Sequence, residues 1–191
     1  MRNKLYFALF LICITRLFFG QDETTKAQQL LRELKAGNID TLKELTELGR
    51  SDPGVKAYLA SQLPAEISDK QHGAVWKAEV QLVGDLRMTA ALPQLVKLLV
   101  DKTDQPILTG MGRYMTMKDD PPATALIAIG NPTVPAVAEL LDSEDRATRS
   151  KAIRLLININ TSDAQNVLAI HAPTEKDASL QLLIQQHTNT K

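Results

Sequence analysis

The chain has 191 residues, of which 44% are hydrophobic and only 4% are aromatic, and its 22 basic side chains balance 22 acidic ones. That length suits one domain with a continuous core. A chain without net charge or a basic block is poorly suited to neutralise a nucleic-acid backbone, so we expect no nucleic-acid partner. Its single cysteine, Cys13, rules out an internal disulfide.

Residues 1–20 have the pattern of a signal peptide. Arg2 and Lys4 precede an apolar run from Leu5 to Ile14, and this run is too short to span a bilayer. We expect cleavage after this segment and export to the periplasm or the medium. The alternative is an uncleaved segment that anchors the protein to a membrane. Without residues 1–20, 19 basic side chains stand against 22 acidic ones, a net charge of −3.

Three amphipathic stretches fill residues 21–69, which we interpret as an N-terminal helical capping repeat. The first ends at Gly37, Asn38 is placed to cap the second, and Asp52 opens the third. We expect residues 64–73 to form a connector. The apolar positions at helical spacing are Ala27, Leu30, Leu31, Leu34, Ile39, Leu42, Leu45, Leu48, Val55, Tyr58, Leu59 and Leu63.

Residues 70–191 repeat a pattern of paired helices. Between Pro121 and Asn160 three helices are expected: Asp119 and Asp120 can cap the first, Asn131 can cap the second, and the third follows Asp145. Leucine and isoleucine positions recur after about 30 residues, a period typical of stacked helical repeats. The predicted inward positions are Val75, Ala78, Leu82, Val83, Leu86, Leu92, Leu95, Val96, Leu99, Ala123, Leu126, Ile127, Val134, Val137, Ala138, Leu141, Ala152, Leu155, Leu156, Ile159, Leu180, Leu183 and Ile184.

The run LLDSEDRATRSKAIRLLINI resembles the HEAT-like repeat of bacterial proteins, in which an acidic turn precedes an arginine and a helix of small residues and leucines. Arg149 would be that arginine, whereas Trp76 takes its place in the earlier repeat. The resemblance implies an all-α fold, namely a short right-handed α-solenoid of stacked antiparallel helical hairpins. The motif specifies a fold and not an activity. A protein-interaction or scaffold role without catalysis is expected because it suits a curved helical surface, a neutral charge and the absence of a catalytic set in the sequence. The alternative is a HEAT-like enzyme of the bilin lyase or base glycosylase type.

Residues 103–120 form an insertion that the repeat does not need, and we expect it to be non-helical. Its apolar residues suit a flap over the core, whereas Arg113 and Tyr114 suit recognition of a protein partner. A short hairpin is expected here, turning at residues 109–112. Arg113 and Tyr114 are therefore the candidate partner-binding residues of the chain.

Few residues of the sequence suggest catalysis or metal binding. The three histidines, His72, His171 and His187, are far apart, and we expect no metal site on a helix. His171 is expected at a helix end with a half-exposed ring. Glu79 lies beside an apolar row, where it is either an acid with a raised pKa or, as we favour, the partner of a neighbouring lysine. We therefore assign no catalytic, cofactor-binding or metal-binding residue and no cofactor, and we expect no stable membrane span.

Overall fold

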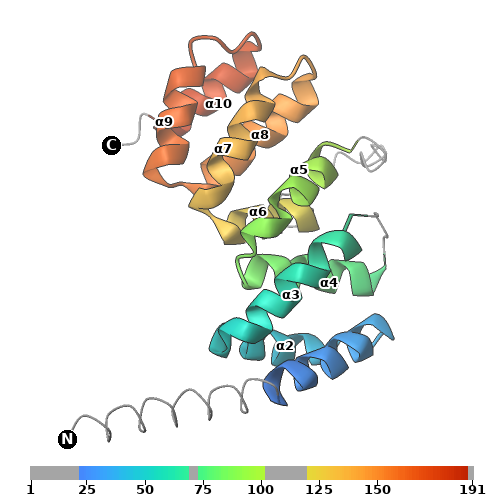
Figure 1. Cartoon of the computed structure of the whole chain (residues 1–191). Coiled ribbons are helices and arrows are strands. Elements are labelled where there is room, and N and C mark those ends of the chain that lie inside the picture. The colour runs from blue at the N-terminus through green and yellow to red at the C-terminus, as the bar shows by residue number, and fades with distance from the viewer. Residues whose placement is uncertain (1–21, 69–72, 102–119, 189–191) are drawn as a thin grey trace, which may run out of the picture.

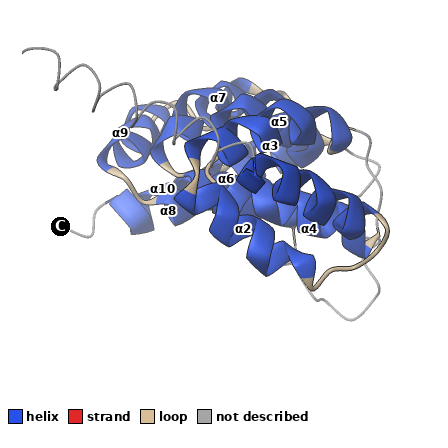
Figure 2. Ribbon diagram, turned by 60° about the horizontal axis from the view of Figure 1, so that its bottom comes forward, coloured by secondary structure: helices blue, strands red, loops and turns tan. Residues whose placement is uncertain are grey.

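Short helices, joined by tight turns, build the protein. A computed structural model describes residues 22–68, 73–101 and 120–188, and in these ranges the chain forms helices and no strand (Figures 1 and 2). The all-α prediction is therefore confirmed. The predicted signal peptide and residues 103–119 of the insertion, with its expected hairpin, lie outside the described residues.

The described chain begins with a helix over residues 22–35. The helices that follow are α2 (Thr41–Ser51), α3 (Pro53–Glu66), α4 (Ala74–Asp85), α5 (Leu92–Val100), α6 (Pro121–Ile129), α7 (Val134–Ala138), α8 (Arg146–Ile159), α9 (Ser162–His171) and α10 (Ala178–Thr188). Single turns of 3-10 helix precede α5 (η1, Thr89–Ala91) and flank α7 (η4, Asn131–Thr133, and η5, Glu139–Asp142).

Side-chain caps begin five of the helices α2 to α10, including α10 itself, where the carboxylate of Asp177 accepts the N–H groups of Ser179 and Leu180. The carboxylate of Asp52 accepts the N–H groups of Gly54 and Val55 at the start of α3. In the same way Asp120 begins α6, Asp145 begins α8 and Thr161 begins α9. Each cap satisfies a backbone N–H that has no partner within the helix. The predicted helix starts at Asp120 and Asp145 are confirmed.

Two predicted caps are wrong. Helix α2 starts at Thr41 instead of directly after Asn38, because the backbone carbonyl of Asn38 accepts from Thr41 in a preceding turn. Asn131 lies in η4, and its side chain does not cap a helix. It accepts from Thr161 at 2.7 Å and donates to Asp163 at 2.6 Å, so it ties its own turn to the start of α9.

The expected connector over residues 64–73 also starts later, because α3 continues through Pro64 to Glu66. A proline near a helix end removes one hydrogen bond but can still follow the helical path when its ring meets no obstacle.

The helices pack in two rows. In one row α2 contacts α4, α4 contacts α6, α6 contacts α8 and α8 contacts α10. In the other row α3 contacts η1 beside α5, α5 contacts α7 and α7 contacts α9. Pairs such as α2 with α3, α5 with α6 and α8 with α9 connect the rows. Figure 1 shows the chain progressing from its N-terminal helices at one end to α9 and α10 at the other.

The core runs along the seam between the rows. Most predicted inward residues are buried, among them Leu31, Leu34, Leu45, Leu59, Leu63, Val83, Leu95, Leu99, Leu126, Val137, Leu155, Leu156 and Ile184. The apolar stripes therefore face the core, as the helical periodicity of the sequence predicted. Because no helix has more than one such stripe, each depends on its neighbours for burial.

Two glycines permit close helix contacts. A Cβ placed on Gly84 of α4 would lie 2.8 Å from the Cα of Ala125 in α6, and one placed on Gly49 of α2 would lie 2.6 Å from a Leu86 methyl. The first obstacle is backbone and cannot move without displacing a helix. The residue Gly84 therefore fixes the separation of α4 and α6.

We predict that Gly84→Ala lowers the free energy of unfolding by about 1–3 kcal/mol, because the added methyl forces α4 and α6 apart. Chemical denaturation measures the change. Lys77→Ala, an exposed substitution on the same helix, is the control and should shift stability by no more than about 0.5 kcal/mol. Equal stability of Gly84→Ala and the unsubstituted chain would contradict the packing described here.

Candidate functional site

A pocket of about 580 Å³ lies where the C-terminal ends of α2, α4 and α6 meet the first turn of α3. Its volume is within the range of small-ligand sites. Its lining residues are Gly49, Arg50, Lys56, Gly84, Asp85, Leu86, Arg87 and Ala128. Glycine, alanine and leucine supply the uncharged part of this wall, and three cations with one anion supply the rest.

The charged residues of the pocket carry a net charge of +2. Arg50 lies 4.0 Å from Asp85, and both side chains are partly exposed. Lys56 and Arg87 form no ion pair with any described residue. The pocket is therefore positive, although the chain beyond residue 20 is net negative.

Arg87 has a left-handed backbone, with φ of +50°. Its N–H donates to the carbonyl of Gly84, and the N–H of Met88 donates to the carbonyl of Val83. This pair of bonds ends a helix in a Schellman motif, where the left-handed residue is usually glycine. A residue with a Cβ costs roughly 1 kcal/mol in this conformation.

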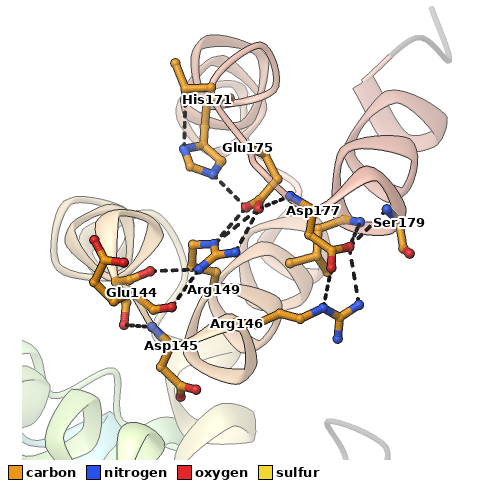
Figure 3. A network of polar contacts seen from close by, with 11 residues as sticks. Glu144, Asp145, Arg146, Arg149, His171, Glu175, Asp177 and Ser179 are labelled. Carbon is orange, nitrogen blue, oxygen red and sulfur yellow. Dashed lines mark hydrogen bonds and ion pairs between the residues drawn. The ribbon is translucent and has the colours of Figure 1, made fainter.

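A second cluster of charged residues joins α8 to the turn between α9 and α10 (Figure 3). The guanidinium of Arg149 donates to both carboxylate oxygens of Glu175 at 3.1–3.2 Å, and to the backbone carbonyls of Ser143 and Glu144 at 2.9 and 3.2 Å. The side chain of Glu175 is completely buried, and the Arg149 side chain is 12% exposed. Arg149 thereby closes the turn before its own helix and holds the turn that precedes α10.

Two carboxylates of this cluster titrate well below their usual range. Burial raises the pKa of Glu175, but hydrogen bonds from Arg149, from the N–H of Asp177 and from His171 outweigh it and lower the pKa to about 2. A hydrogen bond from Arg146, together with the N–H groups of Leu180 and Ser179, lowers the pKa of Asp177. Both groups are anionic at neutral pH, as a structural ion pair requires.

His171 belongs to the same cluster. Its Nε2 lies 3.1 Å from Glu175, four residues later, and its side chain is 11% exposed, so the expectation of a half-exposed ring is wrong. The sequence does place this histidine and glutamate four residues apart, a spacing that can hold a metal ion when both lie on one helix. Because α9 ends at His171, Glu175 lies beyond the helix and its oxygens are occupied by Arg149. Within the described residues, no three histidine, cysteine or acidic side chains are grouped to hold a metal.

Glu79 is buried in α4, with 6% of its surface exposed. Burial raises the pKa of Glu79 and the charge of Glu66 raises it further, against a smaller opposing effect of Lys35. Lys35 itself bonds Glu66 at 2.7 Å. No lysine in the described part of the chain forms an ion pair with Glu79, contrary to the interpretation favoured from the sequence.

The two predicted partner-binding residues, Arg113 and Tyr114, lie outside the described residues, and their role stays a prediction. Sequence analysis missed the pocket, because its three cations are separated by up to 37 positions and only the packing of the rows joins them.

In the part of the chain that the structure describes, no single helix is both long and apolar enough to cross a membrane. One bent pair, α6 with residues 131–142, meets those two criteria together, with an angle of 114° between its halves.

Comparison of the chain with known proteins finds no matching family model, no similar curated protein and no similar solved structure.

We predict that Glu175→Gln destabilises the protein at neutral pH by up to about 3 kcal/mol, because it leaves the guanidinium of Arg149 without its anion. A carboxylate with a lowered pKa stabilises the fold fully above its unfolded value of 4.5, and this contribution disappears as pH falls toward about 2. The stability difference between the unsubstituted chain and the variant should therefore shrink over that window. Denaturation curves at successive pH values test this, with the exposed Glu139→Gln as control; a difference independent of pH would contradict it.

Glu79→Gln is predicted to have the opposite effect. A buried carboxylate with a raised pKa opposes folding above its folded pKa, and the penalty is relieved as the group becomes protonated. The variant should be more stable than the unsubstituted chain at about pH 7, and the gain should fall toward zero near about pH 4. Exposed Glu47→Gln should show no such gain. A loss of stability in Glu79→Gln at neutral pH would indicate that the charged carboxylate has a stabilising partner.

Proposed function

We propose that the chain is an exported HEAT-like repeat protein, a short right-handed α-solenoid of stacked antiparallel helical hairpins, that binds a protein partner without catalysing a reaction. Residues 1–20 would be its signal peptide, residues 21–69 its capping repeat and residues 70–191 its further repeats. The insertion at 103–120 would interrupt these repeats.

The two-row packing is the observation that supports this proposal most strongly. From α2 to α10, each helix contacts the helix two places further along the chain, except that α3 contacts the turn η1 directly before α5. Stacked helical pairs pack in this order. Such an array buries the inner faces of its helices and leaves a long outer surface, on which partners bind in many repeat proteins.

The equivalent positions of Arg149 and Trp76 give a second line of support. Arg149, in the first turn of α8, donates to the carbonyls of the turn before it. Trp76, in the first turn of α4, donates through its indole nitrogen to the carbonyl of Ile67 at 3.4 Å. Both side chains fasten the chain that enters their helix, so the departure from arginine at residue 76 keeps the same architectural role.

A HEAT-like enzyme is the alternative, and Glu79 is the observation that favours it, since perturbed carboxyls gather at active sites. However, Glu79 does not line the pocket. Glu79 is also 6% exposed, which leaves its carboxyl little access to a substrate, so the binding role is the better supported of the two.

Affinity capture from the culture medium and cell envelope, with the purified full chain as bait, tests the proposal. We expect one protein to be enriched, and mass spectrometry of the exported form to find an N-terminus near Gln21. The double change Arg113→Ala with Tyr114→Ala should remove the captured protein while changing stability by about 1 kcal/mol or less.

Exposed Arg154→Ala is the control and should capture the same protein as the unsubstituted chain. Equal capture by the double variant, together with a lower melting temperature, would make the insertion a flap over the core. Failure of the full chain to enrich any protein would contradict the binding role itself.

A further inference from the structure

We propose that the positive pocket between the ends of α2, α4 and α6 binds an acidic segment of the protein partner, with Arg87 as the principal contact. This inference rests on the proposed function and assigns to it a site and a partner chemistry. The pocket is defined by its eight lining residues, all of which the structure describes.

The cations of the pocket differ from the structural cations of the same molecule. Elsewhere Arg149 bonds two carbonyls and a buried carboxylate, Lys151 donates to the carbonyl of Leu99 at 2.7 Å, and Arg146 pairs with Asp177. Among bonds between described residues, Lys56 and Arg87 donate none from their side chains, and Arg50 has only the 4.0 Å contact with Asp85. Their charges are therefore available to a ligand.

These cations are not needed to terminate the helices. The C-terminal end of a helix has a partial negative charge and attracts basic residues for that reason alone. Here, however, a backbone N–H bonds one carbonyl in the last turn of each helix: Asp52 N–H bonds Leu48 in α2, Met88 N–H bonds Val83 in α4, and Gly130 N–H bonds Leu126 in α6. No pocket cation bonds a backbone carbonyl of the described chain.

The backbone conformation of Arg87 supports a binding role for its side chain. Four described residues have positive φ, and the other three are Gly37, Gly130 and Asn160, which are types that tolerate that conformation. Arg87 alone bears a long side chain there, and Arg87 is exposed and is one of the residues that line the pocket. A glycine would suit the local backbone better, so the arginine is explained by what its guanidinium binds.

The uncharged wall selects a peptide over a free anion. Gly49, Gly84, Leu86 and Ala128 leave room for the methylene groups of an extended chain, and the volume of about 580 Å³ far exceeds that of a single phosphate. A guanidinium binds a carboxylate through two parallel bonds. Because Arg50 offsets Asp85, the surplus charge lies on Lys56 and Arg87, which suits two carboxylates separated by a short apolar residue.

Direct titration tests this independently of partner capture. The probe is a fluorescent peptide, Gly-Glu-Leu-Glu-Gly, added to the full chain, with Gly-Gln-Leu-Gln-Gly as its uncharged match. We expect only the acidic peptide to bind, with an affinity that falls as salt is raised. Arg87→Gly should weaken binding by about fivefold or more and raise the melting temperature by about 1–3 °C. Lys56→Gln should weaken binding similarly, and Arg154→Gln should leave it unchanged.

Three results would overturn the inference: equal binding of the two peptides, no binding of either, or undiminished binding to Arg87→Gly. Competition by inorganic phosphate at concentrations that match those of the peptide would identify a simple phosphate site and reject the acidic-peptide assignment. If a partner is captured but the acidic peptide does not bind, the site assignment fails and the proposed function stands.

Discussion

The two rows depend on the close approach of α4 to α6. Gly84 has no side chain to hold these helices apart, and Ala125 contributes only a methyl group, so their backbones nearly touch. Helix α4 also contacts α2, and α6 also contacts α8. The contact of α4 with α6 therefore joins α2 and α4 to α6 and α8 within one row, and it brings the ends of α2, α4 and α6 together at the pocket.

Local chemistry explains which parts of the fold were predictable. Asp120 and Asp145 bond N–H groups only three residues away, so a short stretch of sequence contains both partners. Apolar stripes are equally local, and most predicted inward residues are buried. Asn131 was wrongly read as a cap because its partners, Thr161 and Asp163, lie about 30 residues further on. A separation of 26 residues likewise made the bond between Arg149 and Glu175 unpredictable from the sequence.

The pocket was less predictable, because only the packing of the helices brings its charged residues together. Arg50, Lys56 and Arg87 are separated in the sequence and form no basic run. One signal was present: Arg87 follows the last apolar position of its helix, where glycine or asparagine usually stands. Gly37 and Gly130, which end other helices with positive φ, show that contrast within this one chain. The sequence indicated that Glu79 lies beside an apolar row. Only the structure shows that no lysine of the described chain forms an ion pair with it.

The row architecture has a consequence for how the protein forms. Helices that pack most extensively against each other are first or second neighbours along the described chain, so the main contacts close loops of a few tens of residues at most. Low contact order of this kind favours rapid folding, because little chain entropy is lost before each contact forms. Each helix can dock as soon as the next one or two have been synthesised, and the array can grow outward from any pair that forms first. The protein thus acquires an extended surface without having to search for distant partners in its own sequence.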